Sequence, residues 1–366
     1  MESAPDKNEC PQRDAAARPS GSQKPPARNG LLLCYLRFTA SIWAALARPH
    51  RGSRRRTFLR HRVIMMKFKV GRWAVAIAEA QLETWSNQGA TTSSAATYTS
   101  IKTALDAHKW PDGMEWTPYL QGSYPNATNI RGNSDVDVVV EMTSVFYSDL
   151  TEAEKQARGF TAAKYGYADL RREVLAALQK YYGASMVDAT GPNAIAVAAS
   201  GSRLKADVLP CVTYRQYAGS GTPVEGIKFW NQHTNEEKVN FPKVHIANGS
   251  AKNSSTRTRG WYKPSVRMFK NARERVIGSS DELRKRYPSY FVECLFYNVP
   301  DNAFGTSYVS TYADAVNFLA AALKDGRAQT FTTQSQQQYL FGSASTQWSL
   351  DNAQRFVADL VTLWNQ

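Results

Sequence analysis

The chain has 366 residues, enough for two domains with buried cores. Hydrophobic residues make up 43% and charged residues 21%, which excludes a wholly disordered or fibrous protein. The net charge of +14 raises the question of a polyanionic partner, but residues 1–64 carry +9 of it and the remainder only +5. Because the folded part is only mildly basic, we expect no stably bound nucleic acid.

The four cysteines lie far apart and form neither a metal-binding spacing nor a disulfide framework. They are Cys10, Cys34, Cys211 and Cys294. We expect a reducing, cytoplasmic compartment, with Cys211 and Cys294 packed as small apolar side chains.

Residues 1–64 are interpreted as a disordered or loosely helical extension that catalysis does not need. The first 30 are rich in Pro, Ser, Ala and basic residues and lack apolar periodicity. An apolar stretch follows, but Arg37 interrupts it, which disfavours a membrane span, and no convincing cleavage site indicates secretion. Two interpretations stay open: translation starts at Met65 or Met66, or the segment is a basic arm.

From residue 65 the hydrophobic pattern predicts a helix, then a mixed sheet, then a helical C-terminal half. Helices are expected at 73–82, 98–108, 151–178, 264–276, 308–323 and 349–364, and strands at 116–121, 135–142, 194–199 and 203–212. The stretch 214–260 shows few clear elements, and 290–297 is a short apolar run. The fold class is therefore α+β, with a sheet of five or six strands.

Two acids on one predicted strand are the first chemical signal. Asp135 and Asp137 are separated by one residue, so both side chains leave the same face, roughly 6–7 Å apart along the strand. Two converging carboxylates repel each other unless a cation lies between them, and Mg²⁺, or Mn²⁺ in its place, is the oxygen-seeking ion expected there.

Two further features point to phosphoryl transfer. Gly122 and Ser123 break the preceding strand, and a Gly-Ser turn is suited to holding a phosphate. Asp207 lies on a later strand and shares one face with Arg203 and Lys205, two basic residues that we expect to contact the nucleotide. Three carboxylates from two strands beside a phosphate loop fit two-metal chemistry, with Asp207 placed to help activate an attacking hydroxyl.

A basic segment lies downstream, at residues 252–275. Most of such a run is expected to be a solvated face, above all Arg273 and Arg275. Arg267 and Lys270 are one helical turn apart and can both point into a cleft. Lys270 is the expected triphosphate contact.

These motifs resemble the polymerase-β-type nucleotidyltransferase superfamily, and within it the bacterial cGAS/DncV-like nucleotidyltransferases. The resemblance covers about residues 68–366. It rests on Gly122-Ser123, Asn133-Ser-Asp135-Val-Asp137, Asp207, Phe241-Pro-Lys-Val-His245-Ile-Ala-Asn248, Lys252-Asn253, Lys263-Pro-Ser-Val-Arg267-Met-Phe-Lys270-Asn271 and Ser289-Tyr-Phe-Val-Glu-Cys-Leu.

The resemblance implies a polymerase-β-like mixed sheet closed by a C-terminal helical lobe, with a catalytic core at 65–220 and the helical nucleotide-binding lobe at 221–366. It implies an enzyme that joins nucleoside triphosphates into a cyclic oligonucleotide messenger, releases pyrophosphate and activates a neighbouring effector in anti-phage defence. Asp135, Asp137 and Asp207 correspond to its metal-binding catalytic acids. Ser123, Lys270 and Ser289 correspond to phosphate contacts, and Tyr214 to an aromatic that stacks on a base or packs in the core.

Two alternatives remain from the sequence. One is a transferase that tails RNA or modifies tRNA, which needs a longer basic groove than this charge predicts. The other is an inactive sensor or toxin–antitoxin partner, against which the three acids argue. The bases used are not determined, and Thr213, Tyr214 and Asn248 are the candidates for reading them.

Overall fold

The computed structural model describes residues 77–89, 91–130, 135–217 and 221–366. The interpretations placed on residues 1–64, and the motif residues Asn133 and Ser134, lie outside these ranges.

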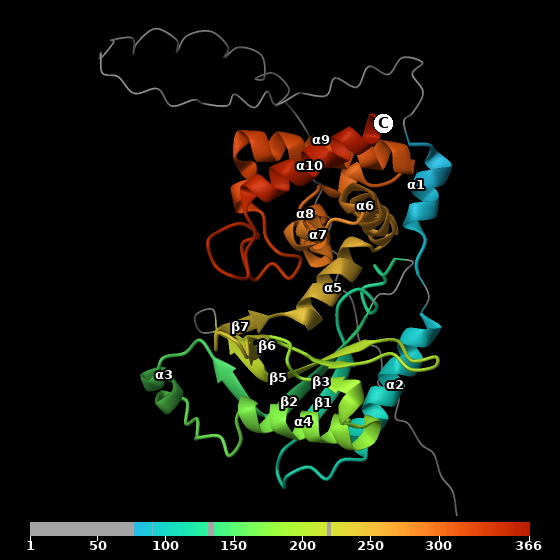
Figure 1. The fold of residues 1–366 in the computed structure, drawn as a ribbon. Coiled ribbons are helices and arrows are strands. Elements are labelled where there is room, and N and C mark those ends of the chain that lie inside the picture. Colours follow the sequence, from blue (N-terminus) through green and yellow to red (C-terminus); the bar gives the residue numbers. More distant parts are fainter. Residues whose placement is uncertain (1–76, 90, 131–134, 218–220) are drawn as a thin grey trace, which may run out of the picture. The chain divides into compact units, whose positions relative to one another are not determined.

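The described chain forms a sheet followed by a helical lobe, and its elements run in the expected order (Figure 1). Along the first half they are α1 (Glu79–Ser86), α2 (Thr92–Asp106), β1 (Trp116–Leu120), β2 (Val136–Ser148), α3 (Glu152–Ala157), α4 (Tyr167–Tyr182), β3 (Val187–Asp188), β4 (Ile195–Val197) and β5 (Ala206–Gln216). Next come β6 (Val224–Trp230), β7 (Glu237–Asn240), α5 (Pro242–Lys252), α6 (Tyr262–Ile277), α7 (Asp281–Arg286), α8 (Ser289–Tyr297), α9 (Tyr308–Asp325) and α10 (Leu350–Trp364).

The sheet is built around β5. Its strand order is β1-β2-β5-β4-β3, and β6 pairs with the other half of β5 and carries β7. Only β2 and β5 are parallel; the other pairs are antiparallel. The sheet has seven strands in the described chain, more than the five or six expected, because short or polar strands such as β3 and β7 give little hydrophobic signal.

Two helices cover one face of the sheet, which explains the alternation in its central strands. Val136 and Val138 of β2 and Val208 of β5 are fully buried and share a core with Ile101 of α2 and Leu170 of α4. Residues that alternate with these valines face the other side of the sheet. Asp137 and Asp207 are therefore directed to that side.

The helical lobe has its own aromatic core, formed by α1 together with α6–α10. Phe269 of α6 stacks on Phe296 of α8, with ring centroids 3.7 Å apart, and Tyr312 of α9 stacks on Trp364 of α10. This lobe is rigidly packed, so side chains on α6 and α8 can be held at fixed positions facing the sheet. The α+β fold with a C-terminal helical lobe is confirmed.

Two expectations about element boundaries were wrong. The capping box at Thr151 and Glu154 does begin a helix, but that helix ends after six residues, at Ala157. Gly159 then adopts a left-handed φ of 70°, and the chain resumes as a helix only at Tyr167. The sheet also continues past residue 220 through β6 and β7, so the helical part starts at α5.

The basic run in α6 is also less solvated than expected. Arg273 is buried and donates to the carbonyl oxygen of Tyr287. Arg267 is 9% exposed and donates to the carbonyl oxygens of Ser86 and Ala127. These guanidinium groups satisfy backbone oxygens at the ends of neighbouring segments, which is a structural role.

Among the described residues, no helix has the length and apolar character needed to cross a membrane.

Glu79 connects α1 to the start of α9. Its carboxylate accepts hydrogen bonds from the backbone N–H groups of Tyr308 (2.7 Å) and Val309 (2.8 Å). These N–H groups have no partner within their own helix, and a negative charge at a helix N-terminus is favourable.

We expect Glu79→Ala to lower the free energy of unfolding by about 1–2 kcal/mol. Glu83→Ala is the matched control, because Glu83 lies one turn along the same helix and is exposed. Urea unfolding of both variants measures the difference. Equal stabilities would contradict a capping role for Glu79.

Candidate active site

The parallel pairing of β2 with β5 brings two acids side by side. Asp137 and Asp207 are direct partners in the register, on neighbouring strands that are about 4.8 Å apart in such sheets. Asp135 precedes β2 by one residue. The expectation that the three acids come together at one place on the sheet is therefore met by the backbone itself.

Lys205 lies among these carboxylates. Its Nζ is 2.5 Å from Oδ2 of Asp135 and 3.4 Å from Oδ1 of Asp207. We expected Lys205 to contact nucleotide, whereas in this structure its ammonium group is the counter-ion of two acids. The carboxylates of Asp135 and Asp207 thus converge on a single positive charge.

Asp137 is electrostatically strained in this arrangement. Burial, followed by the negative charges of Asp207 and Asp135, raises the pKa of Asp137 to about 7. Lys270 and Lys205 oppose the shift but do not cancel it. Protonation of Asp137 therefore relieves both the burial of a charge and the repulsion from the two neighbouring acids.

This donor set fits a hard divalent cation. Carboxylate oxygens are the ligands that Mg²⁺ prefers, and a cation near Asp137 would relieve the charge that raises its pKa. In the parts of the chain that the structure describes, no three acidic, histidine or cysteine side chains form a ready-made metal cluster. Since Lys205 occupies the point on which Asp135 and Asp207 converge, it would have to move for an ion to bind there.

The Gly122-Ser123 turn packs directly against Asp137. Gly122 has a left-handed φ of 73°, and a Cβ atom added to it would lie 2.4 Å from Oδ2 of Asp137. Its carbonyl oxygen accepts a hydrogen bond from Nδ2 of Asn126 (2.7 Å), and that of Ser123 accepts one from the N–H of Thr128 (2.9 Å). Only glycine fits here, because the turn needs both a positive φ and close approach to the acid.

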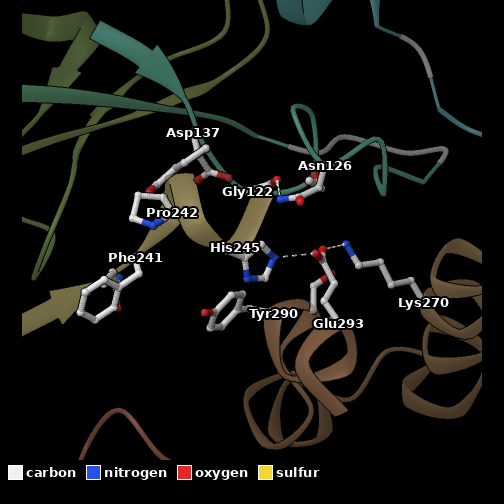
Figure 2. Close-up of a pocket in the computed structure, with 13 residues that line it drawn as sticks. Gly122, Asn126, Asp137, Phe241, Pro242, His245, Lys270, Tyr290 and Glu293 are labelled. Carbon is white, nitrogen blue, oxygen red and sulfur yellow. Dashed lines mark hydrogen bonds and ion pairs between the residues drawn. The ribbon is translucent and has the colours of Figure 1, made fainter. Parts of the chain in front are cut away.

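A pocket of about 330 Å³ opens beside this turn (Figure 2). Its sheet side is formed by Gly122, Ser123 and Asp137, and its helical side by residues of α5, α6 and α8. Ser289 and Lys270, two of the expected phosphate contacts, both line it. The volume falls in the range of small-molecule sites.

Lys270 is 2% exposed and already has partners. Its ammonium donates to the carboxylate of Glu293 and, at 3.1 Å, to the carbonyl oxygen of Thr128. Glu293 also lies 3.3 Å from Nε2 of His245 (Figure 2). A phosphate in the pocket would therefore take Lys270 from Thr128 or share it with Glu293.

Other residues named from the sequence do not line the pocket. The guanidinium of Arg203 lies over the ring of Tyr182, 4.5 Å from its centroid, so Arg203 does not share the direction of Lys205. Tyr214 packs edge-on against Phe241, a pocket residue, at 6.3 Å. Thr213 donates to Glu141, and Asn248 donates to the carbonyl oxygen of Gln334.

Sequence reasoning missed two residues that line the pocket. His245 and Glu293 belong to two of the longer sequence motifs, but no role was predicted for either. Each is nearly fully buried, yet polar. A charged residue inside the apolar run 290–297 is the signal that could have singled out Glu293, because an acid is rarely buried without a partner.

A mixed sheet with paired acids beside a tight Gly-Ser turn, closed by a helical lobe, defines the chain as a nucleotidyltransferase. Comparison with known proteins supports this. The family model described as the cGAS/DncV-like nucleotidyltransferase C-terminal helical domain matches residues 247–365. The chain is 44% identical to the cyclic UMP-AMP synthase of Rhodothermus marinus over 294 residues, which is 79% of this chain and 98% of that protein.

Two further comparisons agree. The chain is 34% identical to the cyclic nucleotide synthase CdnE01 of Staphylococcus haemolyticus, covering 80% of this chain and 100% of that one. The solved structure of the Rhodothermus marinus CdnE c-UMP-AMP synthase with Apcpp and Upnpp superimposes with a TM-score of 0.72 and 43% identity, over 79% of this chain and 97% of that one. The chain belongs to the cGAS/DncV-like nucleotidyltransferases, as the sequence resemblance predicted.

The pH dependence of the free energy of unfolding should reveal the raised pKa of Asp137. The carboxyl in the folded state has a pKa of about 7, whereas an unfolded aspartate has one of about 3.9. The folded state therefore keeps a proton that the unfolded state releases, and stability falls as the pH rises from about 4 to 7. In metal-free buffer at pH 8, Asp137→Asn should be more stable than the wild type by roughly 1–3 kcal/mol.

Thermal or urea unfolding at pH 8 and pH 4 measures this, and most of the gain should be gone at pH 4. Asp112→Asn is the control, because Asp112 is exposed and lies outside the pocket. An Asp137→Asn gain that is the same at both pH values would mean that charge is not its cause.

Gly122→Ala tests the contact with Asp137. The added methyl should displace the Asp137 carboxylate and lower turnover by about tenfold or more. Gly113→Ala is a matched control, since Gly113 has a similar φ of 81° with no atom within 4 Å of an added Cβ. Both variants should lose about 1 kcal/mol of stability from backbone strain. Equal turnover in the two variants would show that the contact with Asp137 is unimportant.

Proposed function

We propose that this chain joins two nucleoside triphosphates into a cyclic dinucleotide, with release of pyrophosphate. The observation that carries the proposal is the pairing of Asp137 with Asp207 across β2 and β5, beside the Gly122-Ser123 turn and its pocket. The names of its relatives, which describe cyclic nucleotide synthases, support the same reaction class.

The proposed step is in-line displacement at the α-phosphorus. A ribose hydroxyl oxygen of one nucleotide forms the new bond, the bond to the leaving pyrophosphate breaks, and the hydroxyl proton passes to Asp207. Mg²⁺, bound by Asp135, Asp137 and Asp207, would polarise the phosphate and stabilise the charge on the leaving group. In a second displacement, the free hydroxyl of the linear intermediate forms a bond to the remaining α-phosphorus, the bond to a second pyrophosphate breaks, and the ring closes.

The remaining pocket residues have roles in binding. Ser123 and Ser289 line the pocket with hydroxyl groups that can donate to phosphate oxygens, and Ser289 is the first residue of α8, where unpaired backbone N–H groups also favour an anion. Lys270 supplies a positive charge between them. These contacts would bind the triphosphate with its α-phosphorus close to the acids.

The product is proposed to act at a distance. A cyclic dinucleotide diffuses, so its partner would be a separate effector, and we place the system in anti-phage defence because the family resemblance implies it. We place the reaction in the cytoplasm, since the free thiols Cys211 and Cys294 fit a reducing compartment.

Removing either paired acid should abolish synthesis. We expect Asp137→Asn and Asp207→Asn to lower product formation by about 10³-fold or more, because each removes a ligand of the cation that stabilises the transition state. Chelation of divalent ions should have the same effect on the wild type. Product is measured with labelled nucleotides, and Asp112→Asn should retain wild-type activity. Full synthesis by the Asp137/Asp207 double variant would refute the assignment.

The product itself is best identified by testing the four triphosphates singly and in pairs, with mass determination. ATP with UTP is the first pair to test, because the 44% identical relative is named a cyclic UMP-AMP synthase. We expect a phosphatase-resistant cyclic dinucleotide from at least one combination. Linear chains that lengthen with time, or label on added RNA, would instead establish a tailing transferase.

A further inference from the structure

One ring nitrogen of His245 has no hydrogen-bond partner in the part of the chain that the structure describes. The residue is on α5, lines the pocket and is 5% exposed. Its Nε2 lies 3.3 Å from Oε2 of Glu293, whereas its Nδ1 is buried and has no hydrogen-bond partner among the described residues. Buried polar atoms are nearly always paired, so an unpaired one on a pocket wall calls for an explanation.

Glu293 determines the form of the imidazole. Burial alone would raise the pKa of Glu293, but Lys270 and the hydrogen bond from His245 hold it at about 2, so the carboxyl is ionised. An ionised carboxylate only accepts hydrogen bonds, and Nε2 must therefore carry the proton. In the neutral ring Nδ1 is then an acceptor.

Nδ1 lies on the side of the imidazole ring that faces Tyr290. Figure 2 shows His245 between Asp137 and Tyr290, with one nitrogen turned to Glu293 and the other toward Tyr290. The rings of His245 and Tyr290 are 5.2 Å apart, and Tyr290 is 43% exposed. Tyr290 also packs on Trp348, with ring centroids 5.7 Å apart. Rotation of the Tyr290 ring is the movement that access of a bound molecule to Nδ1 requires.

We propose that His245 is a specificity residue, whose Nδ1 accepts a hydrogen bond from a hydroxyl or N–H group of the bound nucleotide. Glu293 acts through it, as a positioning residue that keeps the ring in its accepting form. The inference rests on the proposed function in one respect, that a nucleotide occupies this pocket.

The chemistry of the acceptor excludes a phosphate as the group it binds. The bridging, α- and β-phosphate oxygens of a triphosphate carry no proton at neutral pH, so they cannot donate a hydrogen bond to Nδ1. The lone pair of Nδ1 would repel them. The donors that ATP and UTP offer are the ribose hydroxyls, the exocyclic amine of adenine and the ring N3–H of uracil. A site built around a buried acceptor rejects an analogue that lacks the matching donor, because the acceptor then stays unpaired.

The test is a comparison of ligands across three proteins. Wild type, His245→Phe and His108→Phe are titrated calorimetrically with α,β-methylene analogues of ATP and UTP, which cannot release pyrophosphate. The other arms are the same analogues without the 2′-hydroxyl, without the 3′-hydroxyl, without the adenine amine or with a methyl group on N3 of uracil. Phenylalanine keeps the ring but removes the acceptor.

His108 is a matched control. Its Nε2 also contacts a carboxylate, 3.0 Å from Oε2 of Glu173, and its ring also packs on an aromatic side chain, Trp110. It lies outside the pocket. The His108→Phe variant therefore loses a similar histidine–glutamate pair without changing the nucleotide site.

We expect the wild type and His108→Phe to bind one of the depleted analogues about 10- to 100-fold more weakly than its parent. His245→Phe should bind that analogue and its parent equally, within about twofold. The arm that shows this identifies the donor as a ribose hydroxyl, the adenine amine or the uracil N3–H. If the parent-to-analogue ratios of His245→Phe match those of the wild type for every analogue, the proposal is overturned.

A spectroscopic measurement on the wild type does not depend on any variant folding. Long-range ¹H–¹⁵N correlation should find His245 protonated on Nε2, with the Nδ1 resonance shifting when the parent analogue binds. In Glu293→Gln the ring should populate both neutral forms. A ring protonated on Nδ1, or an Nδ1 resonance unmoved by nucleotide, would overturn the proposal.

The outcomes separate this inference from the proposed function. Discrimination at Nδ1 without any cyclic product would leave the inference standing and refute the synthase. Cyclic product with no discrimination between the analogues would support the synthase and refute the inference about His245. A wild type that binds no nucleotide would refute both.

Discussion

The parallel pairing of β2 with β5 determines where the chemistry of this protein lies. Direct pairing of Asp137 with Asp207 places two carboxylates on one face of the sheet, and the buried valines on the opposite face hold that register. A slip of one residue would turn one acid into the apolar core, so the register is strongly specified. The strain at Asp137, the tight turn at Gly122 and the location of the pocket all follow from this pairing.

On the helical side, Glu293 has a comparable role. Its buried carboxylate contacts Lys270 of α6, His245 of α5 and the hydroxyl of Thr128, which lies in the segment that follows the Gly122-Ser123 turn. The sheet side and the helical side of the pocket are thus joined by one charge. Buried charges are tolerated when each is paired, and loss of one partner leaves the others uncompensated.

The sequence predicted those parts of the protein that depend on local patterns. Alternation around Asp137 located its strand and face, and the capping box at Thr151 located the start of α3. The end of α3 was missed, because a left-handed glycine follows it. β7 was missed because it is short and polar, and β6 because Gly226 and Lys228 interrupt its apolar residues. The Lys205 counter-ion and the His245–Glu293 contact join residues far apart in the chain, so only the folded structure reveals them.

Because a parallel pair needs a long crossover connection, the two paired acids are separated by the whole of α3, α4, β3 and β4. During synthesis the ribosome releases Asp137 well before Asp207, and Glu293 later still. A chain whose translation stops between these two acids therefore contains Asp137 but lacks both Asp207 and Glu293. If the product is a messenger, such an incomplete chain cannot make it, and no separate inhibitor is needed to prevent signalling by the fragment.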